Sequence, residues 1–166
     1  MLTKNDLEVN LARIHEWTRS ADQKVSIFLA FQGVVLTLLF TNIFSLVVDN
    51  LKNLPCKTLS IILIISGITL AGYSVYKSIS AIIPQLNKDK KRKSITYFGD
   101  IAKFNYQDFR KEIKEINIDK YEIELIEQIY TSSKIVALKH SQLRDAIFSF
   151  FCGMALLILS FIFLKI

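Results

Sequence analysis

The chain contains 166 residues, of which 51% are hydrophobic and 22% charged, and its formal net charge is +6 at pH 7. Apolar and charged residues in these proportions must be segregated along the chain, which argues against an ordinary soluble domain. The two Cys and two His residues also argue against a disulfide framework and a zinc site.

Three runs without any charged residue occupy positions 25–48, 59–76 and 146–164 and contain 24, 18 and 19 residues. A helix that crosses the hydrocarbon core needs about 20 apolar residues, with a range of about 17–25. A soluble helix seldom remains uncharged for this length, because one of its faces meets water. The runs therefore predict an all-α membrane protein with three transmembrane helices.

Residues 1–24 are predicted to form a cytoplasmic amphipathic helix that continues into the first span. Thr3 and Asp6 provide an N-terminal cap. The first apolar run is longer than a signal-peptide core of about 7–15 residues, so an anchor is expected. Apolar or small residues recur at steps of four and three: Leu7, Leu11, Ile14, Thr18, Ala21, Val25 and Phe28.

The distribution of basic residues predicts the orientation. The short loop 49–58 contains two Lys, whereas residues 84–145 contain thirteen Lys and Arg. Basic residues near span ends favour the cytoplasmic side, so the N-terminus and residues 84–145 are expected to be cytoplasmic and the C-terminus external. The expected organisation is a cytoplasmic helix at 1–24, a transmembrane helix at 25–48, an external loop at 49–58, a transmembrane helix with its cytoplasmic end at 59–83, a cytoplasmic helical region at 84–145 and a transmembrane helix at 146–164.

The cytoplasmic region opens with a basic run from Lys88 to Lys93. Contact with anionic lipid headgroups is a more common role for such a run than nucleic-acid binding, and no nucleic-acid partner is expected. Residues 94–100 are aromatic and β-prone, and residues 106–116 predict a short amphipathic helix.

Residues 117–119 can start a second long helix that continues into the third span. Its predicted buried positions are Ile126, Ile129, Ser133, Val136, His140, Leu143 and Ile147. The two long helices are expected to pack against one another or against a neighbouring subunit. A hydrogen-bonded interface histidine is a more common role for His140 than a ligand or proton relay. Glu122, Glu124 and Glu127 are interpreted as part of a solvated face.

The spans contain only mildly polar residues, among them Gln32 and Ser74. The absence of an ionisable residue at mid-span argues against an ion-coupled transporter. Pairs of small residues at 67 and 71 and at 149 and 153 permit close helix packing. The sequence contains no phosphate-binding loop, serine-nucleophile motif or metalloprotease motif, so a non-enzymatic protein is expected.

Three motifs occur in an order that resembles a known family. Residues 17–24 read WTRSADQK and lead directly into the first span. Residues 98–102 read FGDIA, and residues 128–135 read QIYTSSKI, with Lys139 and Leu143 before the last span. In this order, and with this arrangement of spans, the chain resembles the Pycsar effector transmembrane family.

The resemblance implies a bacterial anti-phage effector in the inner membrane. In such systems a partner pyrimidine cyclase makes cCMP or cUMP on infection, and the effector impairs membrane integrity, which causes growth arrest or cell death. By this resemblance the cytoplasmic helices are expected to form a small helical sensor of the nucleotide. No cofactor beyond this activating ligand is expected, the lipid bilayer is a partner, and the chain is expected to be a homo-oligomer.

A cyclic mononucleotide carries one negative charge and a flat base. Its site needs a cation or a helix N-terminus for the phosphate, and an aromatic ring or an amide for the base. A juxtamembrane charge pair between Asp22 and Lys24 is an alternative role for those two residues. The candidate ligand-binding residues are Tyr97, Asp100, Tyr130, Lys134 and Lys139, with Arg19, Asp22 and Lys24 opposite them if the long helices pack side by side.

Two alternative functions remain open at this point. In the first, the chain is a non-enzymatic membrane interaction or scaffold protein, and its cytoplasmic helices dock a partner. In the second, it is a membrane defence effector of the SLATT type that responds to another signal.

Overall fold

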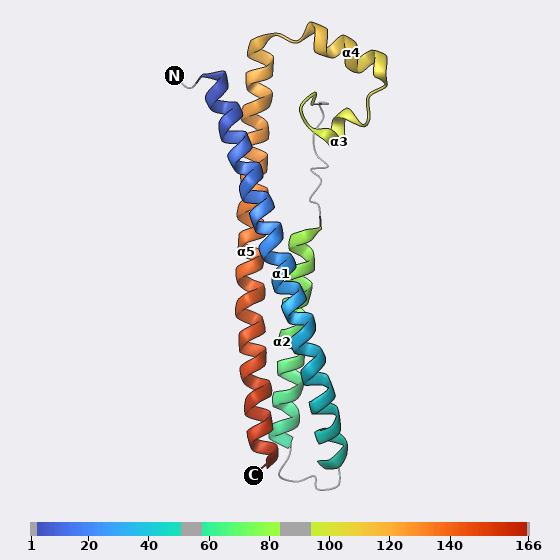
Figure 1. Ribbon diagram of the computed structural model, residues 1–166, viewed down its shortest axis with the longest axis vertical. Helices are drawn as coiled ribbons and strands as arrows, with labels where there is room; N and C mark the ends of the chain where they lie inside the picture. The colour runs from blue at the N-terminus through green and yellow to red at the C-terminus, as the bar shows by residue number, and fades with distance from the viewer. Residues whose placement is uncertain (1–2, 51–57, 84–93, 166) are drawn as a thin grey trace. The chain divides into compact units, whose positions relative to one another are not determined.

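The computed structural model describes residues 3–50, 58–83 and 94–165 (Figure 1). Every regular element in these ranges is a helix, which confirms the all-α prediction. The helices are α1 (Lys4–Asn50), α2 (Thr58–Ile82), α3 (Phe98–Ile101), α4 (Tyr106–Glu115) and α5 (Ile118–Lys165).

Three of the helices in the described ranges are long and apolar enough to cross a membrane: α1, α2 and α5. With 47 and 48 residues, α1 and α5 extend well beyond the roughly 20 residues that a span requires. Both are uninterrupted, as predicted. Large apolar side chains on their surfaces are widely exposed within the chain, including Ile27 at 72% and Phe148 at 72%. Such surfaces fit a lipid environment rather than water.

The contacts divide the chain into two compact units. Unit 1 comprises Met1–Ala21 and Pro84–Leu138, and unit 2 comprises Asp22–Ile83 and Lys139–Ile166. The helices α1 and α5 each contribute residues to both units.

Unit 2 is a bundle of α1, α2 and α5. Its buried cluster takes one residue from each helix, Val25, Ala81 and Leu143, and Phe28 packs against this cluster. The Phe28 and Phe150 rings meet edge to face with centroids 5.7 Å apart. This geometry is the favourable one for aromatic pairs.

Glycines bring α2 and α5 into close contact within unit 2. A Cβ atom at Gly153 would lie 2.9 Å from the Gly67 carbonyl oxygen and 3.2 Å from the Ala71 nitrogen. A Cβ atom at Gly67 would meet the Leu157 side chain at 2.7 Å. The predicted small-residue pairs therefore lie at a close helix–helix contact, because backbones approach this closely only where Cβ atoms are absent.

Unit 1 contains the start of α1, the helices α3 and α4, and the start of α5. The predicted cap is confirmed, since the Asp6 amide donates to Thr3 Oγ1 at 3.3 Å and the Thr3 amide donates to Asp6 Oδ2 at 2.8 Å. Hydrogen bonds from the Thr3 side chain and backbone lower the pKa of Asp6. The predicted short helix is also present as α4, which Asn105 caps by accepting from the Asp108 amide at 2.8 Å.

Four of the seven predicted buried positions on the second long helix are exposed within the chain: Ile126, Ser133, His140 and Ile147. Ile126 is 52% exposed, whereas its neighbour Leu125 is 2% exposed. His140 is likewise exposed while Lys139 is buried, so His140 is not an interface residue within the chain. Adjacent residues on a helix point about 100° apart, so neighbours such as Leu125 and Ile126 differ strongly in burial. Val136 and Leu143 are buried as predicted, so the predicted and observed buried faces of α5 overlap only in part.

The interpretation of residues 94–100 as β-prone is also wrong, because they form a bend followed by α3. The amides of Ser94, Ile95 and Thr96 donate to side-chain oxygens, and the described ranges contain no strand with which they could pair. The basic run Lys88–Lys93 and Cys56 lie outside the described residues.

Candidate functional site

The residues predicted to bind a ligand are distributed over both units. Unit 1 contains Arg19, Tyr97, Asp100, Tyr130 and Lys134, and unit 2 contains Asp22, Lys24 and Lys139.

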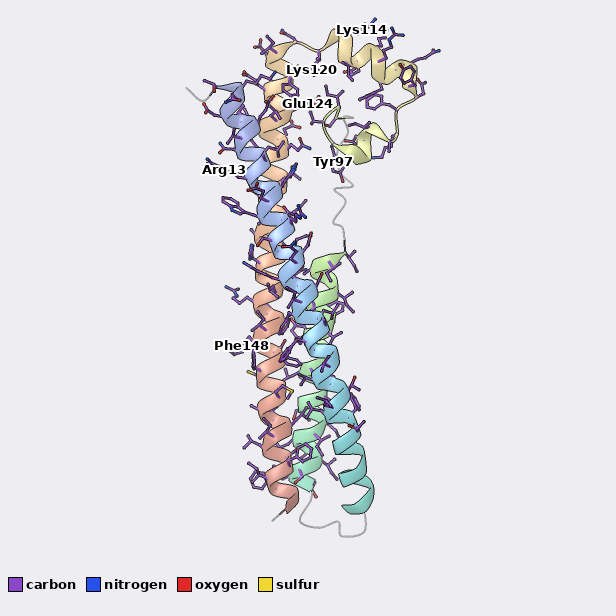
Figure 2. The ribbon with its side chains drawn as sticks, in the orientation of Figure 1. Arg13, Tyr97, Lys114, Lys120, Glu124 and Phe148 are labelled. Atoms are coloured by element: carbon purple, nitrogen blue, oxygen red, sulfur yellow. The ribbon has the colours of Figure 1, made fainter. Side chains whose placement is uncertain are left out.

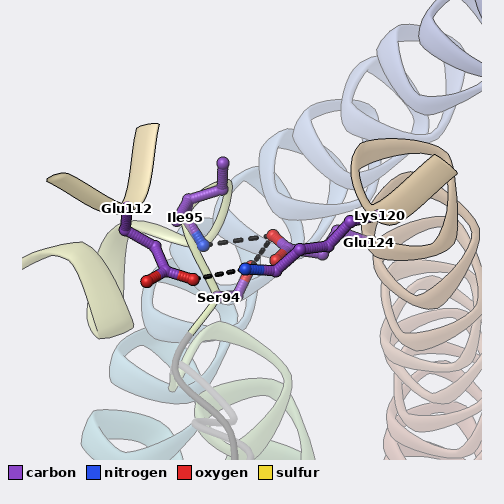
Figure 3. A network of polar contacts seen from close by, with 5 residues as sticks. All are labelled: Ser94, Ile95, Glu112, Lys120 and Glu124. Carbon is purple, nitrogen blue, oxygen red and sulfur yellow. Dashed lines mark hydrogen bonds and ion pairs between the residues drawn. The ribbon is translucent and has the colours of Figure 1, made fainter. Parts of the chain in front are cut away.

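In unit 1 a buried carboxylate holds the loop 94–97 against α5 (Figure 3). Glu124, which is 8% exposed, accepts from Ser94 Oγ at 3.1 Å and from the Ile95 amide at 3.1 Å. One turn further along α5, Gln128 Nε2 donates to the Thr96 carbonyl at 3.1 Å. We call residues 94–97 the tethered loop, and Glu124 and Gln128 its anchors. A buried carboxylate is stable only when hydrogen bonds compensate for its lost hydration, so the loop and Glu124 depend on each other.

Asp100 of α3 binds the first residue of this loop. Its carboxylate is 6% exposed and accepts from the Ser94 amide at 3.2 Å and from Lys103 Nζ at 3.1 Å. Tyr97 lies beside it, and its ring leaves no room for a side chain at Gly99, where a Cβ atom would lie 2.7 Å from Tyr97 Cε1. Asp100 and Tyr97 are therefore part of the packing of the loop. A salt bridge between Lys120 and Glu112 links α5 to α4 in the same region (Figure 3).

Tyr130 and Lys134 form an exposed pair on α5. Lys134 Nζ lies 4.3 Å from the centroid of the Tyr130 ring, which is 61% exposed. The spacing of four residues places the two side chains on one helix face, where a cation–π contact forms. An aromatic face beside a cation can stack on a base and neutralise a phosphate, so this pair retains the chemistry predicted for it.

A second contact in unit 1 ties the beginning of α5 to the beginning of α1. The Tyr121 hydroxyl donates to Glu8 Oε1 at 3.3 Å, and Lys4 Nζ lies 4.8 Å from the centroid of the same ring. Burial, followed by the negative charge of Glu8, raises the pKa of Tyr121. The phenol therefore keeps its proton more firmly in the folded protein.

In unit 2 the predicted residues Asp22 and Lys139 form an ion pair between α1 and α5. The Lys139 side chain is 9% exposed and that of Asp22 43%. The ion-pair partner of Asp22 is thus Lys139 on the other long helix and not Lys24. The side chains of Lys24 and Arg19 are exposed. An ammonium group buried to this degree requires its partner, because the unpaired charge is strongly destabilising.

Within the spans a polar network joins the three helices of unit 2. Gln32 Nε2 of α1 donates to Ser74 Oγ of α2 at 2.5 Å, and Ser78 Oγ donates to Gln32 Oε1 at 3.1 Å. Ser74 Oγ donates in turn to the Ala146 carbonyl of α5 at 2.5 Å. All three side chains are fully buried. We call this set the polar clamp.

Sequence reasoning missed Glu124 and the partnership within the polar clamp. Glu124 is predicted to be solvated because it occurs with Glu122, Glu127 and a neighbouring Lys on a helical stretch. The local pattern does not separate Glu124 from Glu122 and Glu127, because its burial depends on the distant loop residues Ser94 and Ile95. In the described ranges no three His, Cys, Asp or Glu side chains are grouped as a metal site would require.

Comparison with known proteins agrees with the order of the motifs. A sequence model of the Pycsar effector protein domain matches residues 6–165, a range that includes helices of both units. No curated protein and no solved structure matches the chain.

Proposed function

Because the chain belongs to the Pycsar effector family of anti-phage proteins, we propose that it senses cCMP or cUMP and then impairs the inner membrane. The observation that carries this proposal is the family match over residues 6–165, which includes the spans and the region between them. The proposed role is non-enzymatic, with unit 1 as the cytoplasmic sensor and unit 2 as the membrane effector.

The proposed ligand contact is the pair Tyr130 and Lys134. The exposed tyrosine ring offers a stacking face for a pyrimidine, and the adjacent ammonium offers a charge for the cyclic phosphate. The tethered loop is anchored on the same helix by Glu124 and Gln128, so a ligand on α5 can alter how the loop is held.

The proposed transmission runs along α1 and α5 into the membrane. Each helix is uninterrupted, so a rotation produced in unit 1 is carried into unit 2. There it acts on the ion pair between Asp22 and Lys139 and on the polar clamp. Interhelical hydrogen bonds in membranes average about 0.6 kcal/mol, so the three bonds of the clamp contribute about 2 kcal/mol. A ligand that binds the state with the clamp separated about a hundredfold more tightly than the state with the clamp formed supplies about 2.7 kcal/mol. This exceeds the contribution of the clamp.

The experiment has a binding arm and a membrane arm. The purified full chain is titrated with cCMP, cUMP, cAMP and cGMP by calorimetry, and membrane potential is followed in cells that express the chain and are supplied with each nucleotide. We expect one pyrimidine nucleotide to bind and to depolarise the cells. Absence of binding and depolarisation for all four would overturn the proposal and favour a scaffold or an effector of another signal.

Variants separate sensing from transmission. Lys134→Gln is expected to weaken nucleotide binding by about tenfold or more, because a charge-assisted contact to the phosphate is lost. Lys114→Gln removes the same charge from an exposed position on α4 and serves as the matched control. Asp22→Asn should leave binding intact but change the depolarisation response. Wild-type binding and response in Lys134→Gln would remove this residue from the sensor.

A further inference from the structure

An open groove of about 620 Å³ lies between α2 and α5 within unit 2. Leu70 and Tyr73 of α2 form one wall, and Arg144, Asp145 and Phe148 line the other wall on α5. Figure 2 shows Phe148 on the surface of α5. The groove belongs neither to the polar clamp nor to the residues proposed to bind nucleotide.

The depth of the groove relative to the membrane follows from the helix register. The hydrogen bond from Ser74 Oγ to the Ala146 carbonyl places Tyr73 within about one helical turn of Arg144 and Asp145. Ala146 is the first residue of the uncharged run of α5, so the two charges lie where this helix enters the bilayer. The charged end of the groove is therefore at headgroup depth, and its apolar end is directed into the hydrocarbon.

The charged end offers one cation and one anion side by side. Arg144 Nε lies 3.8 Å from Asp145 Oδ1, and the two side chains are 79% and 40% exposed. A pair this long and this exposed interacts weakly, so both groups can take other partners. The guanidinium group can bind a phosphate through two hydrogen bonds, and the carboxylate can accept from a primary ammonium group.

The apolar end of the groove suits an acyl chain. Phe148 is 72% exposed, and Cys152 follows it by four residues on the same face of α5 and also lines the groove. Leu70 faces them from α2, one helical turn from Tyr73 towards the start of that helix.

We propose that this groove binds phosphatidylethanolamine from the leaflet at which α5 enters the membrane. Arg144 binds the lipid phosphate, Asp145 accepts hydrogen bonds from the ethanolamine ammonium, and one acyl chain lies along Phe148 and Cys152. The neutral sum of Arg144 and Asp145 matches a lipid that carries one charge of each sign. Phosphatidylglycerol would leave Asp145 next to a net negative headgroup, and phosphatidylcholine has no N–H group to donate to it.

The test measures lipid retention by the purified full chain. Native mass spectrometry follows chain–lipid complexes after addition of phosphatidylethanolamine, phosphatidylcholine and phosphatidylglycerol with identical acyl chains. We expect phosphatidylethanolamine to be retained about tenfold more than either competitor, the effect of one charge-assisted hydrogen bond. Equal retention of the three lipids, or preference for phosphatidylglycerol, overturns the proposal. A second copy of the chain that displaces the lipid also overturns it.

Variants and a labelling readout assign the contacts. Asp145→Asn should reduce the preference for phosphatidylethanolamine over phosphatidylcholine towards unity, whereas Arg144→Gln should reduce retention of both. Arg13→Gln, an exposed charge in unit 1, is the control and should retain lipid as the wild type does. In a Cys56→Ser background, maleimide labelling of Cys152 should be slower in bilayers that contain phosphatidylethanolamine than in those that contain phosphatidylglycerol. Equal labelling rates, or an unchanged lipid preference in Asp145→Asn, contradict the assignment. No nucleotide enters these measurements, so their failure leaves the proposed function untouched.

Discussion

Gly153→Ala places a methyl group where α2 and α5 are closest, and we expect it to destabilise the bundle. The added Cβ atom would lie 2.9 Å from the Gly67 carbonyl oxygen and 3.2 Å from the Ala71 nitrogen. These are backbone atoms, which cannot rotate away as the end of a side chain can. The helices must therefore move apart, and the contacts on either side of the glycines loosen with them.

The magnitude is obtained by comparison with Gly72→Ala on α2. Position 72 has no atom within 4 Å of an added Cβ, so this variant gains the higher helix propensity of alanine, about 1 kcal/mol, without a clash. Gly153→Ala gains the same propensity but must overpack the helix contact, which typically costs about 1–3 kcal/mol. The gain in helix propensity is the same in both variants and cancels when their unfolding free energies are compared. The difference in the free energy of unfolding between the two variants should therefore be about 1–3 kcal/mol.

The assay is equilibrium unfolding of the purified chain in mixed micelles of increasing denaturing-detergent content, followed by circular dichroism. Gly153→Ala should unfold at a lower detergent fraction than Gly72→Ala. Gly33→Ala, at another position with no atom within 4 Å of an added Cβ, is a second control and should behave like Gly72→Ala. Unfolding of Gly153→Ala and Gly72→Ala at the same detergent fraction would refute the close approach of α2 and α5.

Gln32→Leu removes both hydrogen bonds of this side chain to α2, which at about 0.6 kcal/mol each should lower the free energy of unfolding by about 1 kcal/mol. Thr37→Val is its control, because the Thr37 hydroxyl donates to the Gly33 carbonyl of its own helix at 2.8 Å. Equal losses of unfolding free energy in both variants would contradict the polar clamp. The raised pKa of Tyr121 means that its neutral form stabilises the fold at all pH values below the ordinary value of 10.0, and that this contribution is lost as the pH rises through the folded pKa. Glu8→Gln should lower the Tyr121 pKa only in part, because burial is the larger cause of its rise, whereas the control Glu16→Gln should leave it unchanged. The pKa is measured in both variants from phenolate absorbance during alkaline titration. An unchanged Tyr121 pKa in Glu8→Gln would exclude the charge of Glu8 as a cause.

The sequence alone predicts the three spans, their uninterrupted continuation as α1 and α5, the Thr3 cap and the short helix α4. These features follow from local pattern: the length of uncharged runs, the absence of helix-breaking residues and the chemistry of a cap. The order of motifs also points to the Pycsar effector family, which the match over residues 6–165 shows.

Tertiary structure alone determines which residues of these helices meet. The partner of Asp22 is Lys139, 117 positions away in the chain, and the burial of Glu124 depends on a loop 30 positions before it. No local pattern encodes such contacts, because they depend on the rotation of one helix against another. In a membrane protein this rotation is especially hard to predict from sequence, since lipid-facing and buried surfaces are both apolar, as Phe148 at 72% exposure and Phe150 at 1% illustrate. Hydropathy determined that the chain can span the membrane, and packing determined which of its apolar and polar side chains hold the spans together.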